Sequence, residues 1–126
     1  MATKNDKATR FYSNKQEEYI KNLVGGSRCS NSGAAPFTCG DCVDDLFVYE
    51  CKTQTTSKKS FSIKKSWLED NELERLQLHK QFGAVVIQFE PDGENYFVLP
   101  EKTFKKLLDK YREEWYNKYR NCKEKR

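Results

Sequence analysis

The sequence predicts a single α/β domain in which helices flank a mixed central β-sheet. The chain has 126 residues, 37% of them hydrophobic, which suffices for one compact core but not for two. Residues 84–89 form a continuous apolar run typical of an interior strand. Segments with helical spacing of apolar residues precede and follow the strand-like segments. The expected order is therefore helix, two or three strands, helix, two strands, helix.

The first helix is expected from about residue 14 to residue 24, after a flexible N-terminal arm of residues 1–12 that precedes the domain of residues 13–126. Ser13 and Gln16 have the spacing of a capping box, and Gly25 follows the segment as a stop signal. The apolar side of this helix is expected to consist of Ile20, Leu23 and Val24. Glu17 falls on the same side, and a buried carboxylate requires an ion pair, a capping contact or a metal ion.

Two strands are expected at residues 40–43 and 46–52, joined as a hairpin at residues 44–45. The preceding residues 30–36 are small and suit close approach of a ligand to the backbone. On a strand, side chains two positions apart share a face, so Glu50 and Lys52 project together while Cys51 faces the core. If the hairpin folds back as expected, Asp41 lies close to Glu50.

The second half of the chain is expected to form a helix at residues 62–82, strands at 84–89 and 96–99, and a last helix from about residue 102. A turn at residues 91–93 joins the two strands. The second helix is expected to bury Ile63, Trp67, Leu68, Leu73, Leu76 and Leu78. The apolar residues of the last helix have helical spacing, so we expect them in the core rather than as a surface for base stacking; they are Phe104, Leu107, Leu108, Tyr111, Trp115 and Tyr119.

Charge is concentrated at the C-terminus. The chain carries a net charge of +4, and residues 105–126 contain nine basic against four acidic residues. A basic helix of this kind fits a polyanionic partner such as DNA; a solvated helix face is the alternative. No apolar run is long enough to span a membrane.

Five cysteines make an odd count, and no export signal is evident. We therefore expect reduced thiols and a cytoplasmic protein, in the host cytoplasm if the chain is viral. Cys29, Cys39, Cys42 and Cys51 are numerous enough for a structural zinc site, but a single CxxC pair makes this the weaker alternative. His79 is the sole histidine and lies in a polar segment, so general-base catalysis by histidine is not expected.

The carboxyl groups of Asp41 and Glu50 and the amine of Lys52 are expected to meet at one edge of the sheet. Like charges gathered in this way are unfavourable unless a cation compensates, and Mg²⁺ prefers oxygen ligands. Such an ion can bind a phosphate oxygen and acidify a water molecule. Lys52 would then orient that water, help to deprotonate it, or stabilise the pentavalent phosphate. As a surface ion pair across one strand face, Glu50 and Lys52 would have no catalytic meaning.

Five sequence segments together resemble the PD-(D/E)XK nuclease superfamily, and within it the Holliday junction resolvases of the archaeal type and their phage relatives. The segments are Ser13–Glu17, Asn31–Ala34, Gly40-Asp41, Glu50-Cys51-Lys52 and Ser60–Ile63. The resemblance covers roughly residues 13–100. The proline that often precedes the acidic residue is replaced by Gly40, as in many of these relatives.

The resemblance implies a restriction-endonuclease-like core of the αβββαβ type and a homodimeric, metal-dependent endonuclease that cleaves four-way DNA junctions in recombination and repair. It implies that Mg²⁺, or Mn²⁺ in its place, is held by Glu17, Asp41, Glu50 and the backbone carbonyl of Cys51. It also implies that Ser32 lies near the scissile phosphate. The residues expected to contact DNA are Arg28, Ser32, Gly33, Lys58, Lys59 and Lys64.

Two alternatives remain open at this stage. A nuclease of the same fold could act on duplex, nicked or flapped DNA instead of junctions. A non-catalytic module of this fold could bind nucleic acid without cleaving it. The first alternative predicts cleavage of DNA other than junctions. The second predicts that Lys52→Ala abolishes no chemical activity, whereas a nuclease would lose cleavage and largely keep DNA binding.

Overall fold

The structure is a computed structural model that describes residues 4–29 and 40–124, and within them the side chains of residues 8–29 and 40–120. Ser32, Gly33 and Cys39, all named above as candidate site residues, lie outside these ranges. The elements follow the order α1 (Lys4–Val24), β1 (Ser27–Arg28), β2 (Cys42–Val43), β3 (Phe47–Lys52), α2 (Lys65–Gln77), β4 (Phe82–Gln88), β5 (Asn95–Val98) and α3 (Glu101–Glu124).

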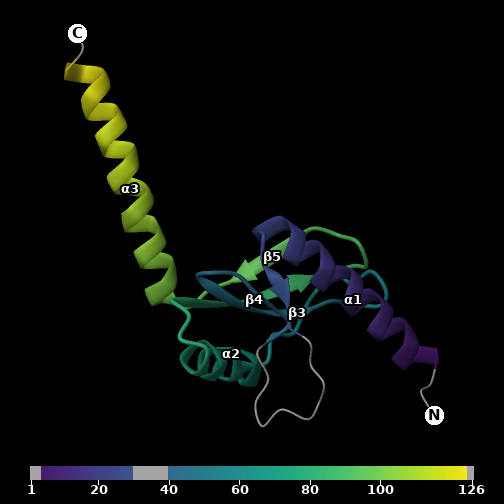
Figure 1. Cartoon of the computed structure of the whole chain (residues 1–126). Helices are drawn as coiled ribbons and strands as arrows, with labels where there is room; N and C mark the ends of the chain where they lie inside the picture. The colour runs from purple at the N-terminus through teal and green to yellow at the C-terminus, as the bar shows by residue number, and fades with distance from the viewer. Residues whose placement is uncertain (1–3, 30–39, 125–126) are drawn as a thin grey trace.

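The five strands form one mixed sheet in the order β1-β2-β3-β4-β5. Only β3 and β4 run parallel, because α2 carries the chain across the sheet between them; the other neighbours are antiparallel. Helices α1 and α2 lie on opposite sides of the sheet (Figure 1). The predicted α/β class with a mixed, helix-flanked sheet is therefore confirmed.

The core lies mainly between the sheet and α1. Ile20 of α1 is fully buried and packs on Cys42, Tyr49 and Cys51 of β2 and β3, and on Ala84 and Val86 of β4. Residues 83–88 of β4 are all buried, as expected for a strand with neighbours on both sides and a helix on each face.

Helix α1 begins at Lys4, so the prediction of a flexible arm was wrong for residues 4–12. These residues contain no glycine or proline, and nothing interrupts the helix before Ser13, which lies inside it. Leu23 is exposed, contrary to expectation. Gln16 occupies an inward position instead, and its Nε2 donates hydrogen bonds to the carbonyl oxygens of Lys52 and Val86.

Helix α2 is shorter than predicted at both ends, and its buried residues differ. Leu73 and Leu76 are more than half exposed, whereas Asn71 and Glu74 are buried. The Asn71 Nδ2 donates a hydrogen bond to the Val48 carbonyl oxygen. A Cβ at Gly83 would lie 2.3 Å from Asn71 Oδ1, so a glycine in β4 allows the helix to approach this closely.

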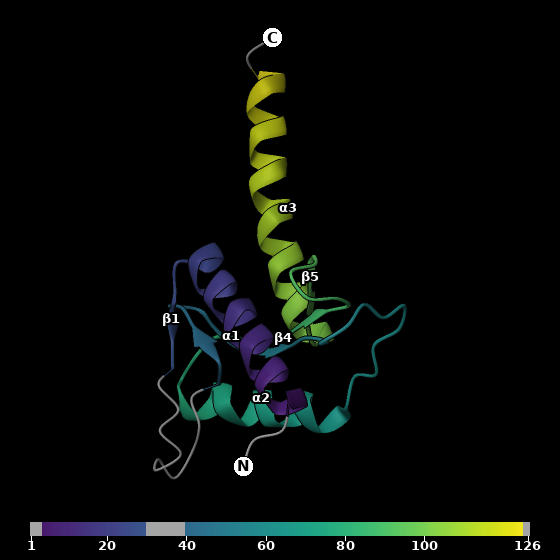
Figure 2. The same cartoon turned by 90° about the vertical axis from the view of Figure 1, so that its right-hand side faces the viewer.

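Helix α3 projects away from the rest of the protein (Figures 1 and 2). The prediction that its apolar side chains belong to the core was wrong, since all of them except the half-buried Leu108 are exposed; they are Phe104, Leu107, Tyr111, Trp115 and Tyr119. Helical periodicity identifies which side of a helix is apolar, but it does not show whether another element packs against that side. None of the helices in residues 4–29 and 40–124 has the length and apolarity needed to cross a membrane.

Candidate active site

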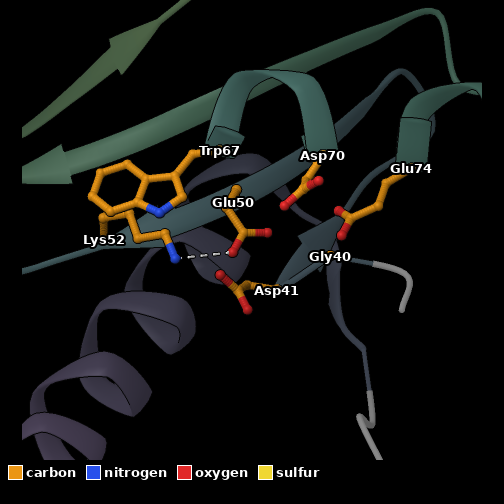
Figure 3. A pocket seen from close by; sticks show the side chains of 7 residues that line it. All are labelled: Gly40, Asp41, Glu50, Lys52, Trp67, Asp70 and Glu74. Atoms are coloured by element: carbon orange, nitrogen blue, oxygen red, sulfur yellow. Dashed lines mark ion pairs between the residues drawn. The ribbon is translucent and has the colours of Figure 1, made fainter. Parts of the chain in front are cut away.

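Strand β3 places Glu50 and Lys52 on one face and buries Cys51 on the other, as the strand alternation predicted. The Lys52 Nζ lies 3.4 Å from Glu50 Oε1 and 4.7 Å from the centre of the Trp67 ring in α2. The ammonium group is thus held between a carboxylate and an aromatic face (Figure 3).

Asp41 is fixed beside β3 by two backbone contacts. Its amide donates a hydrogen bond to the Tyr49 carbonyl, and its Oδ2 accepts one from the Cys51 amide at 2.7 Å. The preceding Gly40 has φ +77°, and a Cβ there would lie 2.6 Å from Val48 Cγ2. Glycine therefore permits the backbone turn that brings Asp41 next to Glu50.

Glu17 reaches the same place from α1. Its carboxyl group shares a hydrogen bond with that of Asp41, and its Oε2 lies 3.8 Å from a guanidinium nitrogen of Arg28. All four predicted catalytic residues are therefore brought together, from one helix, one turn and one strand. Arg28, a predicted DNA contact, lies beside them.

The acidic groups of this cluster retain protons more strongly than isolated carboxyls do. Burial, and then the charge of Asp41, raise the pKa of both Glu17 and Glu50 to about 7. Burial also raises the pKa of Asp41, although the Cys51 amide and Lys52 oppose this effect. The charges of Arg28 and Lys52 lower these pKa values but do not fully offset the effect of burial.

Asp41, Glu50 and Lys52 line a cavity of about 230 Å³ (Figure 3). Its walls add three side chains from α2 to the predicted set, namely Trp67, Asp70 and Glu74. Sequence reasoning did not assign these residues to the site, although their spacing of three and four residues puts them on one helix face. A second cavity of about 580 Å³, which Glu17 and Arg28 line, shares Gly40 and Asp41 with the first.

The chemistry of the donor set fits a hard divalent cation. Glu17, Asp41 and Glu50 supply carboxylate oxygens, and the pKa of each is raised, first by burial and for Glu17 and Glu50 then by the charge of Asp41. A cation bound among them would favour their charged forms. No three His, Cys, Asp or Glu side chains in the described part of the chain are arranged to hold a metal ion as they stand. Binding would replace the Glu17–Asp41 hydrogen bond and the Glu50–Lys52 ion pair.

The cysteines correct one expectation. Cys42 and Cys51 are free and buried, but Cys29 is disulfide-bonded, so the expectation of reduced thiols was wrong for Cys29. A disulfide sulfur is a poor zinc ligand, which removes one of the four thiolates that the zinc alternative requires. The Cys42 thiol donates a hydrogen bond to the Glu17 carbonyl oxygen and thereby ties α1 to β2.

The predicted DNA-contacting lysines lie on the segment of residues 53–64, which joins β3 to α2. Lys58, Lys59 and Lys64 are all exposed. The Lys58 amide is anchored by a hydrogen bond to the Phe89 carbonyl, and the Lys64 Nζ lies 5.9 Å from the Trp67 ring centre. Of the three lysines, Lys64 thus lies close to a residue that lines the cavity.

Comparisons with protein-family models, with curated proteins and with solved structures found no match. The functional interpretation of this chain therefore depends on the geometry of its own residues.

Proposed function

We propose that this protein is a metal-dependent endonuclease that hydrolyses phosphodiester bonds in DNA. The observation that carries the proposal is the convergence of three side chains on Asp41. Glu50 and Lys52 line the same cavity as Asp41, and Glu17 reaches Asp41 from the adjoining second cavity. Phosphoryl transfer needs a metal cation held against the phosphate and a hydrogen-bond donor near it. A cluster of carboxyl groups can hold the cation, and the amine beside it can serve as the donor.

The arrangement of elements supports a restriction-endonuclease-like core and membership of the PD-(D/E)XK superfamily. A helix precedes three antiparallel strands, a crossover helix follows, and the next strand pairs in parallel with β3. This order is the αβββαβ order that the sequence resemblance implies. Fold alone does not define activity, so the proposal depends on the site.

In this proposal Glu17, Asp41, Glu50 and the carbonyl oxygen of Cys51 would hold Mg²⁺ or Mn²⁺. When bound, the ion would supply positive charge to a phosphate oxygen and lower the pKa of a water molecule. The Asp41 carboxylate is held in place by the Cys51 amide before any ion arrives. Part of the ligand set is therefore oriented by the backbone of β3.

Lys52 acts on the phosphate or on the attacking water. Its ammonium group lies at the cavity wall, where it can donate hydrogen bonds to a phosphate oxygen and offset charge in the transition state. Arg28, Lys58, Lys59 and Lys64 bind flanking phosphates, which positions the strand without selecting a sequence.

We propose a four-way DNA junction as the substrate. Symmetric resolution needs two cuts on opposing strands, so a two-fold homodimer would supply the two active sites. This part of the proposal is tested separately from cleavage itself.

The decisive experiment compares Lys52→Ala with Lys80→Ala on labelled junction, duplex and single-stranded DNA, with Mg²⁺ or EDTA. Lys80 precedes β4, near the opposite end of the paired strands from Lys52, and serves as the matched control. We expect Lys52→Ala to cut about 10²- to 10³-fold more slowly while its DNA affinity changes little. Full activity of Lys52→Ala, or no metal-dependent cleavage by the parent protein, would refute catalysis. Equal cleavage of all substrates would refute junction specificity.

A further inference from the structure

Helix α3 carries an exposed row of aromatic rings that the proposed active site does not use. Phe104, Tyr111, Trp115 and Tyr119 recur at intervals of four or seven residues, so they lie along one side of the helix. Between 49% and 70% of each residue's surface is exposed. We call these four residues the α3 aromatic face.

Two rings of the α3 aromatic face form a flat surface. The Trp115 and Tyr119 rings are stacked, with centroids 5.4 Å apart and planes inclined by 2°. Parallel exposed rings at this spacing present their faces and edges to solvent in a fixed orientation. Such surfaces stack on nucleobases, whatever the base, because every base has a π-face.

The basic side chains around the α3 aromatic face favour a polyanion as its binding partner. Lys105 and Lys110 pair with Asp109 and Glu113, whereas no ion pair joins Lys106, Arg112, Lys118 or Arg120 to a described residue. Residues 105–126 carry nine basic against four acidic side chains. Bringing two copies of α3 together would therefore place like charges side by side, whereas a nucleic-acid backbone would neutralise them.

The position of α3 also suits an extended ligand. A helix of 24 residues is about 36 Å long, and α3 points away from the sheet and from α2 (Figure 2). Nucleotides bound along it would lie beyond those held at the cavity. The helix thus offers a contact surface separate from the proposed active site.

We propose that the α3 aromatic face binds unpaired nucleotides of DNA by base stacking, with the neighbouring basic side chains on the phosphates. This inference rests on the proposed function for its choice of DNA. It assigns α3 to the unpaired bases that branched or opened DNA exposes, rather than to dimer formation.

The test measures binding without cleavage, so that its failure is distinguishable from failure of the nuclease proposal. Trp67→Phe leaves Trp115 as the single tryptophan of the chain. Titration of this protein with oligothymidylate in EDTA should quench Trp115 fluorescence. Adding Trp115→Leu and Tyr119→Leu should weaken binding, measured by oligonucleotide anisotropy, at least about tenfold. Asn117→Ala, on another side of α3, is the matched control and should bind normally.

Leucine at positions 115 and 119 retains helix propensity and apolar surface while removing both rings. Circular dichroism should show unchanged helix content in both variants, so that lost binding reports the rings. Absence of quenching by oligothymidylate, or equal affinity of the leucine variant and the parent, would overturn the proposal. So would a concentration-dependent dimer that the two leucine substitutions abolish, or capture by anionic vesicles but not by oligothymidylate, because each identifies another occupant of the α3 aromatic face.

Discussion

The acidic cluster around Asp41 should make the metal-free protein less stable as the pH rises. The ordinary pKa of a glutamate is 4.5, whereas that of Glu17 and Glu50 is about 7 in the folded protein. Between these values the folded state binds more protons than the unfolded chain. The free energy of unfolding therefore falls as the pH rises from about 4.5 through 7, and the stabilisation by bound protons is complete only below this interval.

The size of the effect follows from the same two groups. Raising one carboxyl pKa from 4.5 to about 7 corresponds to about 3 kcal/mol at high pH. Glu17 and Glu50 retain 16% and 20% of their side-chain surface in solvent, so screening reduces each contribution. Both also respond to Asp41, which makes the contributions non-additive. We expect a total loss of about 2–4 kcal/mol between pH 5 and pH 8.

Urea unfolding in EDTA at several pH values measures this loss directly. Glu72 has a pKa lowered to about 2, mainly by Arg75. Its contribution to the free energy of unfolding is therefore nearly constant above pH 5 and does not alter the pH dependence measured there. Glu50→Gln is the control, because a neutral amide should flatten the profile. Mg²⁺ should raise the unfolding midpoint more at pH 8 than at pH 5, since ion and protons compete for the same oxygens. A profile that is flat or rises with pH in EDTA would refute this account of the cluster.

Three further predictions concern residues that shape the site. Gly40→Ala should lower the free energy of unfolding by about 1–3 kcal/mol, because alanine at φ +77° would also approach Val48 Cγ2 to 2.6 Å; a urea midpoint equal to the parent's would contradict this. Gln16→Leu should cost about 1–3 kcal/mol, since it removes the two N–H donors of Nε2, which are shared among acceptors on Lys52, Val86 and Asn95. Lys15→Leu, which removes an exposed ion pair with Asp92, should be nearly neutral in the same assay. Trp67→Leu should slow cleavage about tenfold by releasing the Lys52 ammonium group, whereas Trp67→Phe should retain most activity; equal rates for the two variants would exclude a role for the ring.

Strand periodicity and turn residues sufficed to predict the central part of the fold. The apolar run of residues 84–89 identified β4, and the alternation in residues 47–52 identified β3. The start of α1 was missed because Ser13 and Gln16 have capping-box spacing inside a longer helix. The prediction that the apolar side of α3 is buried in the core was also wrong, because the periodicity of its residues shows which face is apolar and not whether another element packs there.

The strand and hairpin residues of the site could be predicted, but the contribution of α2 could not. Glu50 and Lys52 share a face through the two-residue period of a strand, and Asp41 follows from the hairpin. Glu74 is buried near the cavity only because α2 crosses the sheet between β3 and β4. That crossing depends on long-range contacts, such as Asn71 with Val48, which a local pattern does not contain.

The Glu17 carboxyl group depends on how α1 is attached. The Gln16 side chain is anchored to the ends of β3 and β4, and the Glu17 carbonyl accepts the Cys42 thiol. Detachment of α1 alone would withdraw Glu17 while Asp41 and Glu50 stayed in place. A chain in which α1 has not yet packed on the sheet, or has come away from it, would therefore lack one of the three carboxyl groups. Binding of a metal ion would then occur only after α1 has packed on the sheet.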